Sequence, residues 1–391
     1  MVPLEPWKRV YVEEDFLETV HGQLGCTSCH SGVEKSSDKY EAHQGLVAYP
    51  SDEDADLYCG TCHGEEVETC KNSLHKTQEG YFERFSLRAG YDMRDSGYEH
   101  VLEEFNAECA TCHTSCGQCH VSRPRAVGGG MDWGHEFKKT PDLKKNCTAC
   151  HGSRVGDEYT GENEGFKADV HYIPNAKKCG FCHSADEMHG GDGTLLTYRF
   201  DENNTSAPKC ETCHAGTKEN NTYHQEHWAG DSGVTLSCQV CHSQPYRNCN
   251  GCHVGGDGIT GSSYLTFEIG RNYLKTNERY KNYDYITVRH IPIAPDTYKE
   301  WGVSDLTNFE SSEPTWKLAF PHNIRLWTPQ TETDEGESCS ASCHDSDYYL
   351  RAEDIDYYEN ANYDNETAEI GYGYDDIERE RVANKDVIIP E

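Results

Sequence analysis

The hydrophobic pattern along the chain predicts little regular structure outside one region. Residues 264–330 contain "YLTFEIGRNY" and "YDYITVRHIPIAP", two runs rich in β-branched and aromatic residues that are typical of short strands. The prolines at 292, 295, 314 and 321 argue against long helices in the same region. No apolar stretch approaches the length of a transmembrane helix, and the first twenty residues lack the apolar segment of a signal peptide. We therefore expect a few short strands in 264–330 and no transmembrane segment.

Cysteine and histidine form the strongest pattern in the sequence. The pentapeptide Cys-x-x-Cys-His occurs nine times, and a tenth copy, Cys339–His344, has one additional residue between its cysteines. These motifs use every one of the 21 cysteines except Cys70. The pentapeptide is the attachment signature of c-type haem. The predicted attachment residues are Cys26, Cys29, Cys59, Cys62, Cys109, Cys112, Cys116, Cys119, Cys147, Cys150, Cys179, Cys182, Cys210, Cys213, Cys238, Cys241, Cys249, Cys252, Cys339 and Cys343.

The spacing of the motif explains why it suits haem. On a helical turn, residues three and four positions apart share a face, so two thiols can reach one porphyrin edge while the histidine approaches the iron. Zinc knuckles and disulfide frameworks also use closely spaced cysteines, but neither requires a histidine directly after the second cysteine. We expect short helices at the motifs and ten proximal iron ligands. These are His30, His63, His113, His120, His151, His183, His214, His242, His253 and His344.

The histidines outside the motifs nearly match the motifs in number. Of the 21 histidines, eleven lie outside the motifs, and the sequence contains only 4 methionines. Since ten haems need ten sixth ligands, we expect bis-histidine, low-spin iron at all or nearly all sites. The sequence does not reveal which of these histidines serves which haem. The candidates are His21, His43, His75, His100, His135, His171, His189, His224, His227, His290 and His322.

This ligation pattern limits both function and fold. Iron with two axial histidines has no open position for a substrate, so electron transfer is its natural function, and no catalytic residue is predicted. Only 35% of the residues are hydrophobic and the mean hydropathy is −0.85, which is poor material for a large apolar core. Porphyrins would supply that core. We therefore expect a mostly irregular multihaem cytochrome c array with low secondary-structure content.

The distribution of the motifs predicts three parts. Residues 1–260 would form a nine-haem array, and residues 261–338 a haem-free insertion with short strands that supplies distal histidines. Residues 339–391 would hold the tenth site and a tyrosine-rich tail with 15 acidic and 4 basic residues after position 344. Because the motifs at Cys109 and Cys116, and those at Cys238 and Cys249, begin close together, we expect two pairs of adjacent haems.

Charge limits the partners. The formal net charge of −33 disfavours nucleic acid and anionic membranes, and favours cationic proteins, metal ions and mineral surfaces. Two "GGDG" stretches, 190–193 and 255–258, raise calcium as a further cofactor, although the pattern favours plain turns. Thioether attachment of haem takes place outside the cytoplasmic membrane. We therefore expect an extracellular or cell-surface protein whose leader peptide has been removed, with the periplasm as the alternative.

The ten motifs and the histidine surplus resemble the multihaem c-type cytochromes of metal-respiring bacteria and archaea, including those that polymerise into extracellular nanowires. The resemblance implies electron transfer to other multihaem cytochromes, metal oxides or electrodes, through haems in alternating parallel and T-shaped pairs. It also suggests a head-to-tail homopolymer. The stretched site Cys339–His344 and the long insertion depart from the family pattern. Multihaem reductases of nitrite, hydroxylamine or tetrathionate and soluble periplasmic shuttles are the alternatives, although the reductases often carry a Cys-x-x-Cys-Lys site that is absent here.

Overall fold

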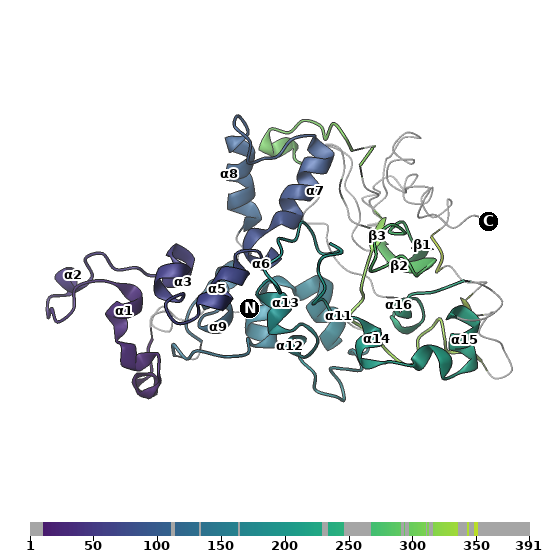
Figure 1. The fold of residues 1–391 in the computed structure, drawn as a ribbon, viewed down its shortest axis with the longest axis horizontal. Helices are drawn as coiled ribbons and strands as arrows, with labels where there is room; N and C mark the ends of the chain where they lie inside the picture. The colour runs from purple at the N-terminus through teal and green to yellow at the C-terminus, as the bar shows by residue number, and fades with distance from the viewer. Residues whose placement is uncertain are drawn as a thin grey trace, which may run out of the picture. The chain divides into compact units, whose positions relative to one another are not determined.

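Short helices and irregular segments make up most of the fold (Figure 1). Apart from two longer helices, each α-helix spans three to seven residues, so the expected low content of regular structure is confirmed. No helix in the described part of the chain is long and apolar enough to cross a membrane. The computed structural model describes residues 11–110, 114–132, 134–162, 165–228, 234–245, 267–290, 293, 297–309, 311–312, 316–334, 342–343 and 348–350.

Helical turns form at the seven motifs whose residues are all described, as the spacing predicts. At Cys59–His63, the amide of His63 donates to the carbonyl of Cys59 over 2.9 Å, which closes one helical turn. Each turn places the two cysteines and the histidine on one side of the backbone. The motif helices are α1 (Cys26–His30), α9 (Cys116–His120), α10 (Thr148–Cys150), α12 (Cys179–Cys182), α14 (Cys210–Cys213) and α16 (Cys238–His242).

The chain divides into two compact units, each discontinuous in sequence. The first comprises residues 1–81, 105–152 and 178–207, and the second comprises 82–104, 153–177 and 208–391. The predicted parts 1–260, 261–338 and 339–391 were defined by haem motifs, whereas these units are defined by contacts between residues. The predicted division therefore stays a prediction. The other short helices of the first unit are α2 (Lys39–Ala42), α3 (Pro50–Glu53), α4 (Ala55–Tyr58), α5 (Gly64–Cys70), α6 (Leu74–Thr77) and α13 (Ala185–Met188), and those of the second are α11 (Asp157–Thr160) and α15 (Thr222–Trp228).

The second unit contains a three-stranded antiparallel sheet. Both runs predicted as strands from the sequence contain one, and the order across the sheet is β1-β2-β3. In the central strand, Val288 lies opposite Glu268 on one side and Leu318 on the other. Val288 and Leu318 are fully buried, together with Ile286 and Trp316. The strands are β1 (Glu268–Arg271), β2 (Tyr285–His290) and β3 (Trp316–Leu318).

Residues 348–350 extend this sheet at the free edge of β1. The amide of Ile269 donates to the carbonyl of Tyr348 over 2.6 Å, and the amide of Leu350 donates to the carbonyl of Ile269 over 2.9 Å. The Cys343 thiol lies 3.3 Å from the hydroxyl of Tyr349. A cysteine of the stretched motif is therefore held beside the sheet edge.

The structure contains two longer helices, and the first of them contributes to an apolar cluster that the sequence analysis did not predict. Phe82, Phe85 and Ala89 are buried at helical spacing, which is the signal that could have revealed the first of these helices. The ring of Phe85 packs edge-on against Tyr298, with ring centroids 5.3 Å apart. The second unit thus has an apolar core of its own. The helices are α7 (Glu79–Ala89) and α8 (Glu99–Glu108), and each contains residues of both units.

Candidate haem-ligand sites

Histidines come together in pairs within each unit. At six places a motif histidine faces a histidine from outside the motifs, with ring centroids 5.8–6.2 Å apart. Every pair takes one member from each of the two classes defined by the sequence. The pairs are His63 with His21, His30 with His135, His151 with His75 and His120 with His189 in the first unit, and His214 with His171 and His242 with His224 in the second.

The separation of the rings suits two ligands of one metal ion. A metal–imidazole bond is about 2 Å long, so two rings that bind one ion from opposite sides have centroids roughly 6 Å apart. The angle between the ring planes varies from 16° in the pair His21–His63 to 78° in the pair His75–His151. Two imidazoles fill the two axial positions of a haem iron, whereas a structural zinc ion takes four protein ligands. The paired donors therefore fit haem iron.

Three motif histidines are oriented by the same two-point contact. In each case one distant residue accepts a hydrogen bond from the imidazole Nδ1 and donates its own amide to the carbonyl of the histidine. Since Nδ1 then carries the proton, Nε2 keeps the lone pair that binds a metal. The contacts join His30 to Val47 (2.7 and 2.8 Å), His120 to Lys138 (2.6 and 2.7 Å) and His242 to Arg325 (3.1 and 2.8 Å).

Two other histidines are oriented by carboxylates. Nδ1 of His171 lies 2.8 Å from Oδ1 of Asp169, and Nδ1 of His183 lies 2.9 Å from Oε2 of Glu187. His224, by contrast, follows the carbonyl pattern, because its Nδ1 lies 2.6 Å from the carbonyl oxygen of Thr217. The acceptor therefore differs from one candidate ligand to another.

Burial favours the neutral form of six of the twelve paired imidazoles, and the neutral form is the one that binds metals. Burial lowers the pKa of His151 to about 4, and nearby His75 and His183 act in the same direction. The pKa of His183 itself is raised, chiefly by its hydrogen bond to Glu187. The pKa values of His21, His75, His135, His189 and His242 are also lowered, in each case mainly by burial.

The thiols of different motifs also meet in pairs. In the first unit, Cys59 lies close enough to Cys116, and Cys147 to Cys179, for the two thiols of each pair to shift each other's pKa. In the second unit, the thiols of Cys210 and Cys238 likewise lie close enough to shift each other's pKa. Each contact connects the first cysteines of two motifs, so these motifs are direct neighbours.

Cys70, the cysteine outside the motifs, ends α5. Burial raises the pKa of its thiol, and nearby Cys116 acts in the same direction. A raised thiol pKa lowers the fraction of reactive thiolate. Cys70 therefore lies near one motif without belonging to it.

For the candidate distal histidines outside the six pairs, the described contacts say less about a ligand role. His43 and His100 are exposed. The amide of His322 donates to Oε2 of Glu158 over 2.9 Å, and His227 lies on α15 together with His224. Outside the described residues lie Cys112, His113, Cys249, Cys252, His253, Cys339, His344 and the side chain of His290, so the expected adjacency of the haems at Cys109 and Cys116, and at Cys238 and Cys249, stays a prediction.

The first of the two glycine-rich stretches forms a turn. Gly190, Gly191 and Gly193 have positive φ angles, and Oδ1 of Asp192 accepts the amide of Thr194 over 3.0 Å. The second stretch, 255–258, lies outside the described residues. Among the residues that are described, no group of three or more histidine, cysteine, aspartate or glutamate side chains is placed to hold a metal ion. Calcium stays a prediction.

Sequence reasoning missed the residues that orient the ligands. Asp169 lies two positions before His171 and Glu187 four positions after His183, and an acidic residue at such a distance from a histidine is a visible signal. Val47 and Arg325 act through the backbone, which every residue type possesses, so no sequence signal marks them. Only the fold reveals these partners.

Known proteins provide no comparison for these sites. Searches against protein-family models, curated proteins and solved structures found no match to the chain. The functional argument therefore rests on the motifs and on the geometry of the ligands.

Proposed function

We propose that this chain is a multihaem c-type cytochrome that transfers electrons along a series of bis-histidine haems. The observation that carries the proposal is the set of six histidine pairs, each of which joins a motif histidine to a histidine outside the motifs at the separation that a shared metal requires. Each of these pairs combines the two classes of histidine that the sequence defines, as the two axial ligands of a bis-histidine haem would.

Cysteines and histidines would have different roles in holding the haem. The two thiols of a motif would attach the porphyrin covalently, and the paired imidazoles would bind the iron from its two sides. Backbone carbonyls such as that of Val47 hold the imidazole in the tautomer that presents Nε2. When bound, haem supplies one-electron chemistry between ferric and ferrous iron.

Neighbouring motifs support transfer from site to site. The thiol contacts Cys59–Cys116, Cys147–Cys179 and Cys210–Cys238 bring three pairs of motifs together. We propose that haems attached to each such pair exchange electrons directly. The paired ligation favours this function over a multihaem reductase, because a reductase needs an iron with an open position.

The negative charge of the protein favours partners that carry positive charge. A net charge of −33 suits cationic proteins, metal ions and mineral surfaces, so we propose an extracellular metal oxide or another multihaem cytochrome as the acceptor. An electron carrier in the periplasm is the alternative.

Mass spectrometry and metal analysis test the proposal. For the protein matured in a host that attaches c-type haem, we expect ten covalent haem additions, ten iron atoms and no zinc, because the sequence contains ten motifs. The double variant C26S/C29S should lose one haem, whereas C70S should keep all ten. Nine additions in the unaltered protein would rule out the stretched motif, and a haem-free protein that contains zinc would rule out the whole proposal.

A further inference from the structure

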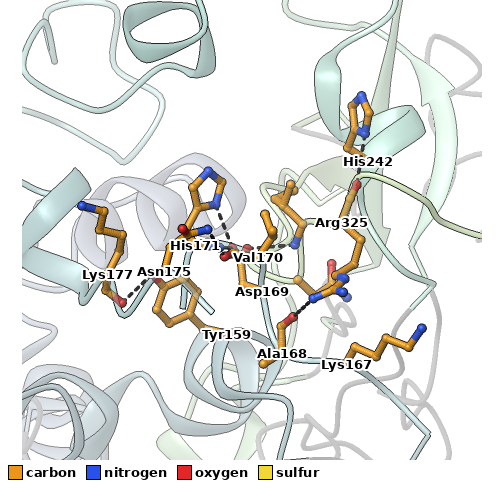
Figure 2. A network of polar contacts seen from close by, with 12 residues as sticks. Tyr159, Lys167, Ala168, Asp169, Val170, His171, Asn175, Lys177, His242 and Arg325 are labelled. Atoms are coloured by element: carbon orange, nitrogen blue, oxygen red, sulfur yellow. Dashed lines mark hydrogen bonds and ion pairs between the residues drawn. The ribbon is translucent and has the colours of Figure 1, made fainter. Parts of the chain in front are cut away.

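The second unit holds two adjacent ligand pairs in different ways. His171 and His214 form one pair, and His224 and His242 form the other. Figure 2 shows His171 and His242 at two ends of one polar network, which runs through Asp169 and Arg325. The acceptor for His242 is a neutral carbonyl, whereas the acceptor for His171 is a carboxylate.

Asp169 is buried, and three hydrogen bonds hold its carboxylate in place. Only 2% of the residue is exposed. Oδ1 accepts hydrogen bonds from both the amide and the Nδ1 of His171, each over 2.8 Å, and Oδ2 accepts the amide of Ile324 over 2.8 Å. These three donors orient the carboxylate. One of them, the imidazole of His171, is itself a predicted metal ligand.

Hydrogen bonds around Asp169 connect one histidine of each pair, His171 and His242. The amide of Val170 donates to the carbonyl of Ile324 over 2.9 Å, while the next residue, Arg325, forms the two-point contact with His242. Nη1 of Arg325 donates to the carbonyl of Ala168 over 3.0 Å. Both acceptors belong to the same hydrogen-bonded segment. They therefore differ mainly in charge: Asp169 offers a carboxylate to His171, whereas Arg325 offers a neutral carbonyl to His242.

A carboxylate acceptor alters the metal that the imidazole binds. It draws the Nδ1 proton toward itself, makes Nε2 a stronger donor and places a negative charge near the iron. Both effects stabilise ferric iron over ferrous iron, because the ferric form carries one more positive charge. Burial of the carboxylate strengthens this electrostatic effect, since a low dielectric medium screens charges weakly.

Resting on the proposed function, we propose that Asp169 and Glu187 are positioning residues that lower the reduction potentials of the haems ligated by His171 and His183 below those of haems whose histidines donate to carbonyls. Glu187 makes the equivalent contact in the first unit, where its Oε2 lies 2.9 Å from Nδ1 of His183 and its side chain is 12% exposed. The two units therefore each contain a haem site of low potential.

A reductive titration followed by visible absorbance tests the inference with D169N and E187Q in the haem-loaded protein. In each variant we expect one of the ten one-electron components to move to higher potential, with at least a tenfold change in the ferric-to-ferrous ratio at that site, which corresponds to about 59 mV. Asparagine can still accept both hydrogen bonds from His171 through Oδ1, but its amide nitrogen would face the amide of Ile324, so D169N removes the charge together with that one hydrogen bond. E187Q decides the same question at an independent site if D169N folds poorly.

The control variant is D284N, which removes a negative charge from the second unit. Asp284 binds the amide and hydroxyl of Thr235 and the ammonium of Lys275, and its effect on the titration should be small. Ten haems in both test variants, with curves that superimpose on the unaltered protein or shift no more than that of D284N, would overturn the inference while leaving the proposed function intact. A protein that carries no haem at all would refute both.

Discussion

Replacement of His135 by glycine is expected to convert one haem in ten from low-spin to high-spin iron and to make that haem bind cyanide or carbon monoxide. The His135 ring faces His30 with centroids 5.8 Å apart, so the variant would leave this iron with a single axial histidine. His30 would stay in place, because both of its contacts with Val47 are independent of His135.

The backbone of His135 supports a ligand role. Its φ angle is 75°, in the left-handed region, which costs a residue with a side chain about 1–2 kcal/mol. Such strain persists where the surroundings impose it, and here the ring also packs edge-on against Phe16 with centroids 5.0 Å apart. Glycine adopts this conformation without cost, so H135G removes the ligand without adding backbone strain.

Electron paramagnetic resonance of the oxidised protein and ligand-binding spectra provide the measurement. The unaltered protein should contain only low-spin iron and should not bind cyanide readily. E136A, at the neighbouring exposed position, should behave like the unaltered protein. If H135G kept ten low-spin haems and bound no external ligand, the assignment of His135 to this site would be wrong.

The sequence predicts two classes of candidate ligand, but it does not reveal which histidines lie opposite one another. The pentapeptide marks both cysteines and the proximal histidine because all three must share one helical turn, which is local information. The histidines that face the motif histidines come from distant parts of the chain: His30 faces His135, 105 positions later, while His63 faces His21, which precedes it by 42. Such pairing depends on the course of irregular loops, for which the hydrophobic pattern provides no periodic signal.

Part of the fold could also be predicted from the sequence, namely the elements that have a periodic or compositional signal. The strands in 264–330 were visible because β-branched and aromatic residues dominate both runs, and prolines restricted their length. The buried positions Phe82, Phe85 and Ala89 follow the spacing of a helix face, which is an equally clear signal in the sequence. The carbonyls of Lys138 and Arg325 could not be predicted, because a backbone acceptor has no signature in the sequence.

The two units differ in how much apolar core they possess without cofactors. In the second unit, Val288, Trp316 and Leu318 are at most 1% exposed. In the first unit, large apolar side chains next to the motifs are exposed: Leu57 is 61% exposed two positions before Cys59, and Phe181 is 58% exposed between Cys179 and Cys182. Covering one such side chain contributes about 1.5–3 kcal/mol, and porphyrins attached at these motifs would supply the covering surface.

The chain produced without haem attachment is therefore expected to lose the first unit and to keep a folded remnant of the second. Hydrogen exchange measured by mass spectrometry should show nearly complete loss of amide protection in residues 11–81, while β2 and the buried residues of α7 stay protected. The haem-loaded protein, in which both units should be protected, is the matched control. Equal protection of the two units in the haem-free chain would show that the first unit has a sufficient core of its own, because folding without cofactors requires enough buried apolar area to offset the entropy of ordering the chain.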